Sequence, residues 1–281
     1  MRLTSFILLL FLTAPCFSQI IEQRDFKNPH PSESDFRKVN FMQLAALVHI
    51  ENLKKIPLTK KFKLIGPTAA MRYNLCSDQD YATQISVAKC AGIMVSKEVI
   101  LTSASCFESI DDCENYRWVF DYNYNQKIGG VIKVTSDNIF SCRTILRREY
   151  DKDSGVDYMA IALKREPPRG YMDFRVSGQL SHRDKLLVPS FHMGTPMKVT
   201  KGLLVNSLRK DEFSFCHPSI HPLPGSPVYN WYTGQVEGLV TSFNKEFLIY
   251  DHENQCNRIV SQGNEQCNAL HAMKIHRVFE L

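Results

Sequence analysis

The chain has 281 residues, of which 44% are hydrophobic and 22% charged, and its formal net charge at pH 7 is +5. This composition is that of an ordinary globular protein rather than a disordered one, and it provides enough apolar residues for one or two sizeable cores. The net charge is too small to indicate a nucleic acid or a membrane surface as the partner.

The first residues have the features of a secretory signal. Arg2 precedes an apolar run at residues 6–12, and small residues follow at Ala14 and Ser18. A spanning helix needs about 18 apolar residues, so this short run predicts a signal peptide over residues 1–18, cleaved before Gln19. A lipoprotein signal with Cys16 as the lipidated residue is the alternative, which Pro15 disfavours. The mature protein is therefore expected to be secreted, either periplasmic or extracellular, with no membrane span.

The cysteine content agrees with secretion. Removing Cys16 with the signal leaves eight of the nine cysteines, an even number that favours four disulfides in an oxidising compartment. Eight cysteines allow about 105 pairings, so the count alone does not fix the connectivity.

Residues 19–40 form a polar N-terminal arm with Pro29 and Pro31, which we expect to have little structure of its own. A basic stretch follows, with Phe62 as its one aromatic residue. We interpret it as a solvated loop or an edge strand rather than a polyanion site. Its lysines are Lys54, Lys55, Lys60, Lys61 and Lys63.

Short apolar runs rich in β-branched residues then recur between turn residues. Many short strands with few helical periods predict an all-β sandwich or barrel. The runs are at residues 91–101, 118–122, 131–134, 158–163, 186–189, 202–205, 227–229 and 238–243. Residues 266–278 instead place Leu270, Met273, Ile275 and Val278 at a roughly helical spacing, which predicts a C-terminal helix.

Residues 90–106 read C-A-G-I-M-V-S-K-E-V-I-L-T-S-A-S-C. This segment resembles the strand, turn and strand that carry the catalytic histidine of trypsin-like serine peptidases, with the form C-G-G or C-S-G, a hydrophobic strand and L-T-A-A-H-C. The resemblance implies a Cys90–Cys106 disulfide and places the general base just before the second cysteine. This chain has Ser105 there. A hydroxyl cannot replace imidazole as a base near neutral pH.

A second segment, V-D-Y-M-A-I-A-L at residues 156–163, resembles the family's D-Y-A-L-I-x-L. The resemblance implies that Asp157 occupies the position of the aspartate that orients the histidine. The plain alternative is a surface aspartate at the start of a strand.

A third segment, L-P-G-S-P-V-Y-N-W-Y-T-G-Q-V-E-G-L-V at residues 223–240, resembles G-N-S-G-S-P-V-F-N-x-x-T-G-x-V-E-G-I of bacterial secreted trypsin-like peptidases. Aligning the shared G-S-P places Pro224 at the nucleophile and Pro222 at the preceding glycine. In the family, the backbone N–H groups of these two positions form the oxyanion hole. Proline has no N–H, and each missing donor typically costs about 10²–10³ in rate.

The resemblance covers residues 41–281 and implies a double barrel: two six-stranded antiparallel β-barrels, over about residues 41–165 and 166–281, with a C-terminal helix. Three further cysteine pairings are expected. Cys113 and Cys142 flank the run at residues 118–122 and are expected to pair. Cys256 and Cys267 are expected to close a C-terminal loop, which leaves Cys76 to Cys216 by elimination.

The segment C-H-P-S-I-H, with Cys216, His217 and His221, has the residue types of a zinc site. A disulfide cysteine in a loop with two exposed histidines is the favoured interpretation, because secretion opposes a reduced cysteine. No metal and no cofactor are expected. Because the chain contains no G-x-S-x-G turn, none of Ser103, Ser219 and Ser226 is expected to serve as a relocated nucleophile.

These observations predict a catalytically inactive homologue of trypsin-like peptidases that acts as a secreted binding or regulatory protein. Its partner would be a protein or a surface ligand, not a nucleic acid. The alternatives are an active serine endopeptidase with an atypical site and a purely structural envelope protein.

Overall fold

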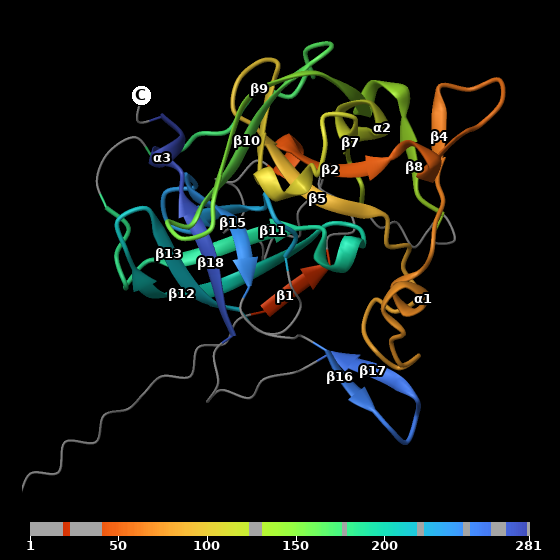
Figure 1. The fold of residues 1–281 in the computed structure, drawn as a ribbon. Helices are drawn as coiled ribbons and strands as arrows, with labels where there is room; N and C mark the ends of the chain where they lie inside the picture. The colour runs from red at the N-terminus through yellow and green to blue at the C-terminus, as the bar shows by residue number, and fades with distance from the viewer. Residues whose placement is uncertain are drawn as a thin grey trace, which may run out of the picture.

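The computed structural model describes residues 19–22, 41–123, 131–175, 179–217, 222–243, 248–259 and 268–279, with only the backbone of 19–22 (Figure 1). The predicted signal peptide and most of the N-terminal arm lie outside these residues. Within the described part of the chain, no helix is long and apolar enough to cross a bilayer.

The first barrel is closed and antiparallel, with the strand order β10-β6-β5-β2-β7-β9. Side chains alternate across each strand, so Leu47, Trp118 and Ile161 point to the barrel interior and are fully or almost fully buried. Its strands are β2 (Leu44–His49), β5 (Ala88–Met94), β6 (Val99–Thr102), β7 (Tyr116–Phe120), β9 (Ile139–Asp151) and β10 (Val156–Leu163).

The second barrel is also six-stranded, because β12 pairs with β13 and closes the sheet β12-β11-β14-β15-β18-β13. Its interior is filled by Leu186, Val188, Phe213 and Phe215. Its strands are β11 (Lys185–Ser190), β12 (Lys198–Leu208), β13 (Glu212–His217), β14 (Pro227–Asn230), β15 (Val236–Phe243) and β18 (Asn268–Lys274). The all-β double barrel is confirmed, and each predicted run overlaps a strand.

The outer faces of the two barrels pack together in a third core. Tyr122, beyond the end of β7, stacks on Phe191, beyond the end of β11, with ring centroids 5.7 Å apart. Along the barrel strands, every second residue points away from the barrel interior, and several of these outward residues join this third core. Examples are Ala46 and Val119 from the first barrel and Leu187 from the second. Both faces of these strands are therefore buried, which explains their nearly continuous apolar runs.

The connections between barrel strands carry two additions. Between β2 and β5 lie η3 (Ile50–Asn52), β3 (Leu53–Lys55), β4 (Lys61–Leu64) and α1 (Ala69–Tyr73), and β4 pairs with β8 (Lys133–Thr135) in a three-stranded sheet. We interpreted the basic stretch as a solvated loop or an edge strand, and it does contain an edge strand, β3. Between β15 and β18, the hairpin of β16 (Leu248–Asp251) and β17 (Cys256–Ile259) projects beside α1 (Figure 1).

Two local predictions need correction. Residues 266–278 do not form one helix, because β18 occupies most of the segment and only the short α3 (His276–Phe279) follows. Leu270 lies in the interior of the second barrel and Met273 in the core between the barrels, so strand alternation and barrel closure prevail over the helical spacing. The N-terminal arm contains a strand, β1 (Gln19–Glu22), which pairs antiparallel with β12.

The disulfides agree with the predictions in part. The Cys90–Cys106 and Cys113–Cys142 bonds are confirmed. The pairings Cys76–Cys216 and Cys256–Cys267 are wrong, because Cys76 is bonded to Cys256, 180 positions further along the chain. Cys216 is disulfide-bonded as well, and its partner lies outside the described residues.

The Cys76–Cys256 bond ties the β2–β5 connection to the β16–β17 hairpin. We expect Cys76→Ser with Cys256→Ser to lower the free energy of unfolding by about 2–5 kcal/mol, because the bond closes a very long loop in the unfolded chain. Urea denaturation measures the loss, with the exposed neighbour Ser77→Ala as a control. An unchanged midpoint would show that the disulfide contributes nothing to stability.

Candidate functional site

The turn that follows β6 is held by two contacts with β5. The short helix η4 (Ala104–Cys106) carries Ser105 at the exposed surface, and Cys106 is bonded to Cys90. The Thr102 hydroxyl, at the end of β6, donates to the carbonyl of Ala91 over 2.6 Å. The position of Ser105 is therefore fixed by the disulfide-braced strand pair.

Asp157 faces this turn from the start of β10, with only 6% of its surface exposed. The Ser105 N–H donates to Asp157 Oδ1 over 3.1 Å, and the Ser105 hydroxyl donates to Oδ2 over 3.2 Å. The Ser103 hydroxyl donates to Oδ2 as well, and the two serine hydroxyls lie 2.6 Å apart. The buried carboxylate is thus satisfied by hydroxyls and an amide, and this cluster contains no imidazole to serve as a base near neutral pH.

The turn before β14 carries Pro222 and Pro224. Its three N–H groups are all engaged within the second barrel: Leu223 donates to Ser190 Oγ (2.8 Å), Gly225 to the carbonyl of Val240 (2.8 Å), and Ser226 to the carbonyl of Leu223 (3.2 Å). The two prolines have no N–H. The turn therefore presents no backbone donor toward Ser105.

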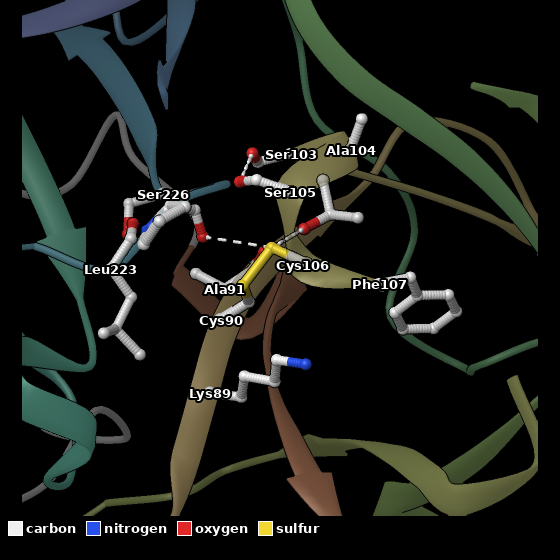
Figure 2. The surroundings of a disulfide bond; sticks show 12 residues. Lys89, Cys90, Ala91, Ser103, Ala104, Ser105, Cys106, Phe107, Leu223 and Ser226 are labelled. Carbon is white, nitrogen blue, oxygen red and sulfur yellow. Dashed lines mark hydrogen bonds between the residues drawn. A yellow bond between two sulfur atoms is a disulfide. The ribbon is translucent and has the colours of Figure 1, made fainter. Parts of the chain in front are cut away.

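The two turns meet at the boundary between the barrels (Figure 2). The N–H of Ala91 donates to the carbonyl of Pro224 over 2.9 Å, and this carbonyl lies 3.9 Å from Cys106 Sγ. Gly225 has φ +80°, and a Cβ there would lie 2.1 Å from the carbonyl oxygen of Ala91. The structure therefore brings together the turns that carry Ser105 and Pro224, with Asp157 behind the first.

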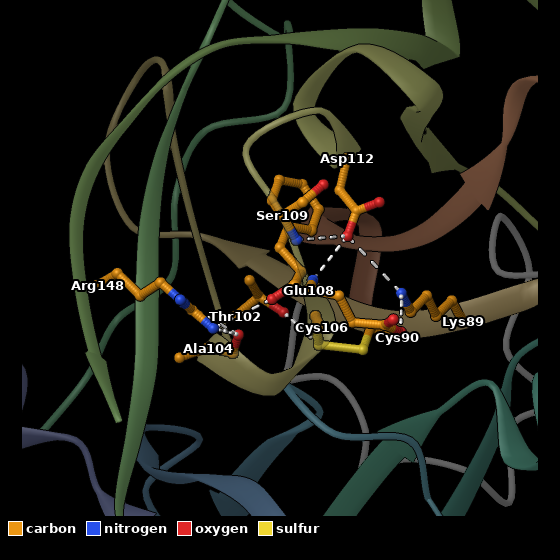
Figure 3. A network of polar contacts seen from close by, with 10 residues as sticks. Lys89, Cys90, Thr102, Ala104, Cys106, Glu108, Ser109, Asp112 and Arg148 are labelled. Atoms are coloured by element: carbon orange, nitrogen blue, oxygen red, sulfur yellow. Dashed lines mark hydrogen bonds and ion pairs between the residues drawn. A yellow bond between two sulfur atoms is a disulfide. The ribbon is translucent and has the colours of Figure 1, made fainter. Parts of the chain in front are cut away.

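A polar network holds the other flank of the Ser105 turn (Figure 3). Asp112, at the start of α2 (Asp112–Asn115), accepts from the N–H groups of Glu108 and Ser109 over 2.7 and 3.4 Å. Lys89 of β5 pairs with Glu108 over 3.1 Å and with Asp112 over 3.9 Å. These contacts fix the chain that leaves the turn.

Arg148 of β9 reaches over the turn and donates to the carbonyls of Ala104 (3.3 Å) and Phe107 (3.2 Å). The sequence offered no signal for this clamp, because it depends on the length and bend of the β9–β10 hairpin. The ion pair of Arg175 with Glu237 was missed because 62 positions separate the two residues; it is bidentate, at 2.6 Å for each contact, and the Glu237 side chain is almost completely buried.

Of the other candidate nucleophiles and ligands, Ser226 is held inside the second barrel. Ser226 is fully buried; its hydroxyl donates to the carbonyl of Leu223 over 2.6 Å and lies 2.6 Å from Ser190 Oγ within the second barrel. Ser219, His221 and the side chain of His217 lie outside the described residues. Among the residues that the structure describes, no group of histidine, cysteine and acidic side chains could hold a metal ion.

The double barrel and the meeting of the two turns at their boundary place the chain in the class of trypsin-like double-barrel folds. No family model and no curated protein matches the chain. Solved structures similar to it include an inactive serine-to-alanine mutant of Rv3671c from M. tuberculosis, with 12% identity, TM-score 0.49 and coverage of 90% of this chain and 91% of the other.

Two further similar structures are described as a serine protease and a peptidase. Neuropsin from mouse brain has 11% identity, TM-score 0.49 and coverage of 84% and 90%, and kallikrein-related peptidase 10 with Zn²⁺ has 11% identity, TM-score 0.44 and coverage of 68% and 86%. Identities this low carry no activity over to this chain, and the fold class follows from its own strand order.

The close approach at Gly225 predicts a strong effect of a single methyl group. Gly225→Ala should lower the free energy of unfolding by about 2–5 kcal/mol, since it adds a clash with the backbone of Ala91 to the strain of a left-handed φ. Thermal and urea unfolding measure this loss.

Gly170→Ala is the matched control, because its φ is +69° and a Cβ there meets only Gln43 Nε2, at an ordinary 3.5 Å. It should cost only the conformational strain, about 1–2 kcal/mol. Equal losses in the two variants would contradict the tight contact between the barrels at Gly225.

Proposed function

We propose that this protein is a catalytically inactive member of the trypsin-like peptidase group that is secreted and acts by binding a partner. The observation that carries the proposal is the use of every N–H group of residues 222–226 inside the second barrel, together with the prolines at 222 and 224. Stabilisation of the oxyanion by preorganised donors is usually the largest single contribution to this chemistry, and the turn offers none.

The cluster at Ser105 supports the same proposal from the other barrel. A serine nucleophile needs an adjacent base in hydrogen-bonding reach, and the side chains that bond Asp157 in the Ser105 turn are the hydroxyls of Ser103 and Ser105. Residual catalysis in a broken triad depends on the oxyanion hole. Loss of both features together therefore supports inactivity more strongly than either loss alone.

Binding is proposed because both barrels keep their strand pairing and packed cores although the two turns lack the groups that catalysis needs. Loops on a rigid β scaffold are suited to recognition, and the partner would be a protein or a surface ligand. The three described disulfides support an oxidising compartment, either periplasmic or extracellular.

The proposal predicts that the purified mature protein neither reacts with a fluorophosphonate probe nor cleaves casein. Labelling is measured by mass spectrometry of the intact protein, with trypsin under the same conditions as the positive control. Stoichiometric labelling or sustained cleavage would overturn the proposal and favour the active peptidase with an atypical site.

Restoring side chains alone should not restore chemistry. We expect Ser105→His with Pro224→Ser to remain unreactive toward the probe, because Pro222 still supplies no N–H and a missing donor costs about 10²–10³ in rate. Adding Pro222→Gly is the minimum further change. Activity of the double variant would show that the alignment of this turn with the family's nucleophile turn is wrong.

A further inference from the structure

The three-stranded sheet β3-β4-β8 has two chemically opposite faces. Leu53, Phe62, Leu64 and Val134 point inward, and all four pack in or against the core between the barrels. Because strand side chains alternate, the intervening residues point outward. The outward face carries Lys54, Lys61, Lys63 and Lys133, all exposed.

The register places three of these lysines in one row across the strands. Lys54 pairs with Lys63, and Lys63 pairs with Lys133. Directly opposed side chains in a sheet have Cβ atoms about 5 Å apart, and like charges there are destabilising. Since the apolar inner face fixes the orientation of the sheet, all three lysine side chains leave the backbone on the same outward face.

Acidic side chains do not relieve this repulsion in the described residues. None of the ion pairs there involves Lys54, Lys61, Lys63 or Lys133. The neighbouring Glu51 is directed to His49 instead, at 3.6 Å. The outward face is thus a compact, uncompensated row of positive charge at the molecular edge, where β4 and β8 stand in Figure 1.

We propose that this lysine face binds a linear acidic polysaccharide, one that carries sulfate or carboxylate groups along its chain. A row of charges at strand spacing, about 4.8 Å, matches a polymer with closely spaced anionic groups, and the polymer would remove the repulsion within the row. Lysine is a flexible point charge, so the face would recognise charge density rather than one sugar sequence.

The composition of the face argues against the other polyanions. Aromatic side chains, on which single-stranded nucleic acids stack, are absent from it, since Phe62 points inward. Apolar side chains, which stable attachment to a lipid surface needs as a second signal, are absent from the row as well. The nearest candidate is Leu58, fully exposed in the β3–β4 turn.

The sequence favoured a solvated loop or an edge strand over a polyanion site, because Phe62 is the one aromatic residue of the basic stretch. Lys133 lies 70 positions beyond Lys63, and only the pairing of β4 with β8 completes the row. This site is separate from the degenerate turns and goes beyond the proposed function, so either proposal can fail without the other.

The test compares binding of dextran sulfate and of neutral dextran of equal length to the full mature protein. We expect binding of dextran sulfate only, and an affinity loss of tenfold or more at low salt for Lys54→Thr, Lys63→Thr and Lys133→Thr combined. The slope of log affinity against log salt should fall by about 2–3, through lost counterion release. The melting temperature of this variant should not fall, because like charges have been removed.

The matched control replaces three exposed lysines far along the chain, Lys152→Thr, Lys185→Thr and Lys210→Thr, which changes the net charge equally. It should bind dextran sulfate like the unchanged protein. An equal loss in both variants, or no binding of dextran sulfate, would overturn the proposal. The proposal would also be overturned, in favour of a membrane surface, if the protein bound anionic phosphatidylserine vesicles more strongly than dextran sulfate and lost this binding with Leu58→Ser.

Discussion

The hydrogen bond from the Ala91 N–H to the Pro224 carbonyl is the contact on which the arrangement of the two barrels at the site depends. It joins the strand next to the Cys90–Cys106 disulfide to the turn before β14, and the absence of a side chain at Gly225 permits the approach. A proline retains its carbonyl while it loses its N–H. The contact between the barrels therefore needs only the carbonyl group of residue 224, which proline retains. The fold tolerates proline at this position, although an oxyanion hole built from backbone N–H groups would not.

In the first barrel, too, the fold is satisfied without the groups that catalysis would need. A buried carboxylate is costly unless hydrogen bonds satisfy it, so a chain without imidazole at this position must supply other donors to Asp157. Ser103, Ser105 and the Ser105 N–H provide them. The two turns thus share one property, since the N–H and hydroxyl groups described for each are satisfied by hydrogen bonds within the turn and its own barrel.

The sequence predicted what local patterns determine. The strand runs, the Cys90–Cys106 bond and the placement of Asp157 beside the Ser105 turn all lie in short segments that resemble a known family. The Cys76–Cys256 bond could not be predicted, because it depends on how two additions to the barrels meet, 180 positions apart. The helical spacing of residues 266–278 gave a wrong prediction for a related reason. This segment forms β18 because it pairs with β13 and β15, and both strands are distant from it in sequence.

What distinguishes this chain from a minimal double barrel is concentrated in the connection between β2 and β5. Its first half forms the lysine face together with β8. Its second half is bound to the β16–β17 hairpin by the disulfide and by the ion pair of Arg258 with Asp78 at 2.7 Å, and Arg258 also pairs with Asp251 inside the hairpin. Exposed ion pairs are individually weak, but here they flank a covalent link and a small shared core of Ala69, Leu75 and partners. The connection is thus a rigid addition rather than a loose loop, and rigid additions lose less conformational entropy on binding. The proposed binding surface is therefore better sought along this connection than at the turns that carry Ser105 and Pro224, where the described N–H groups of residues 222–226 are used inside the second barrel.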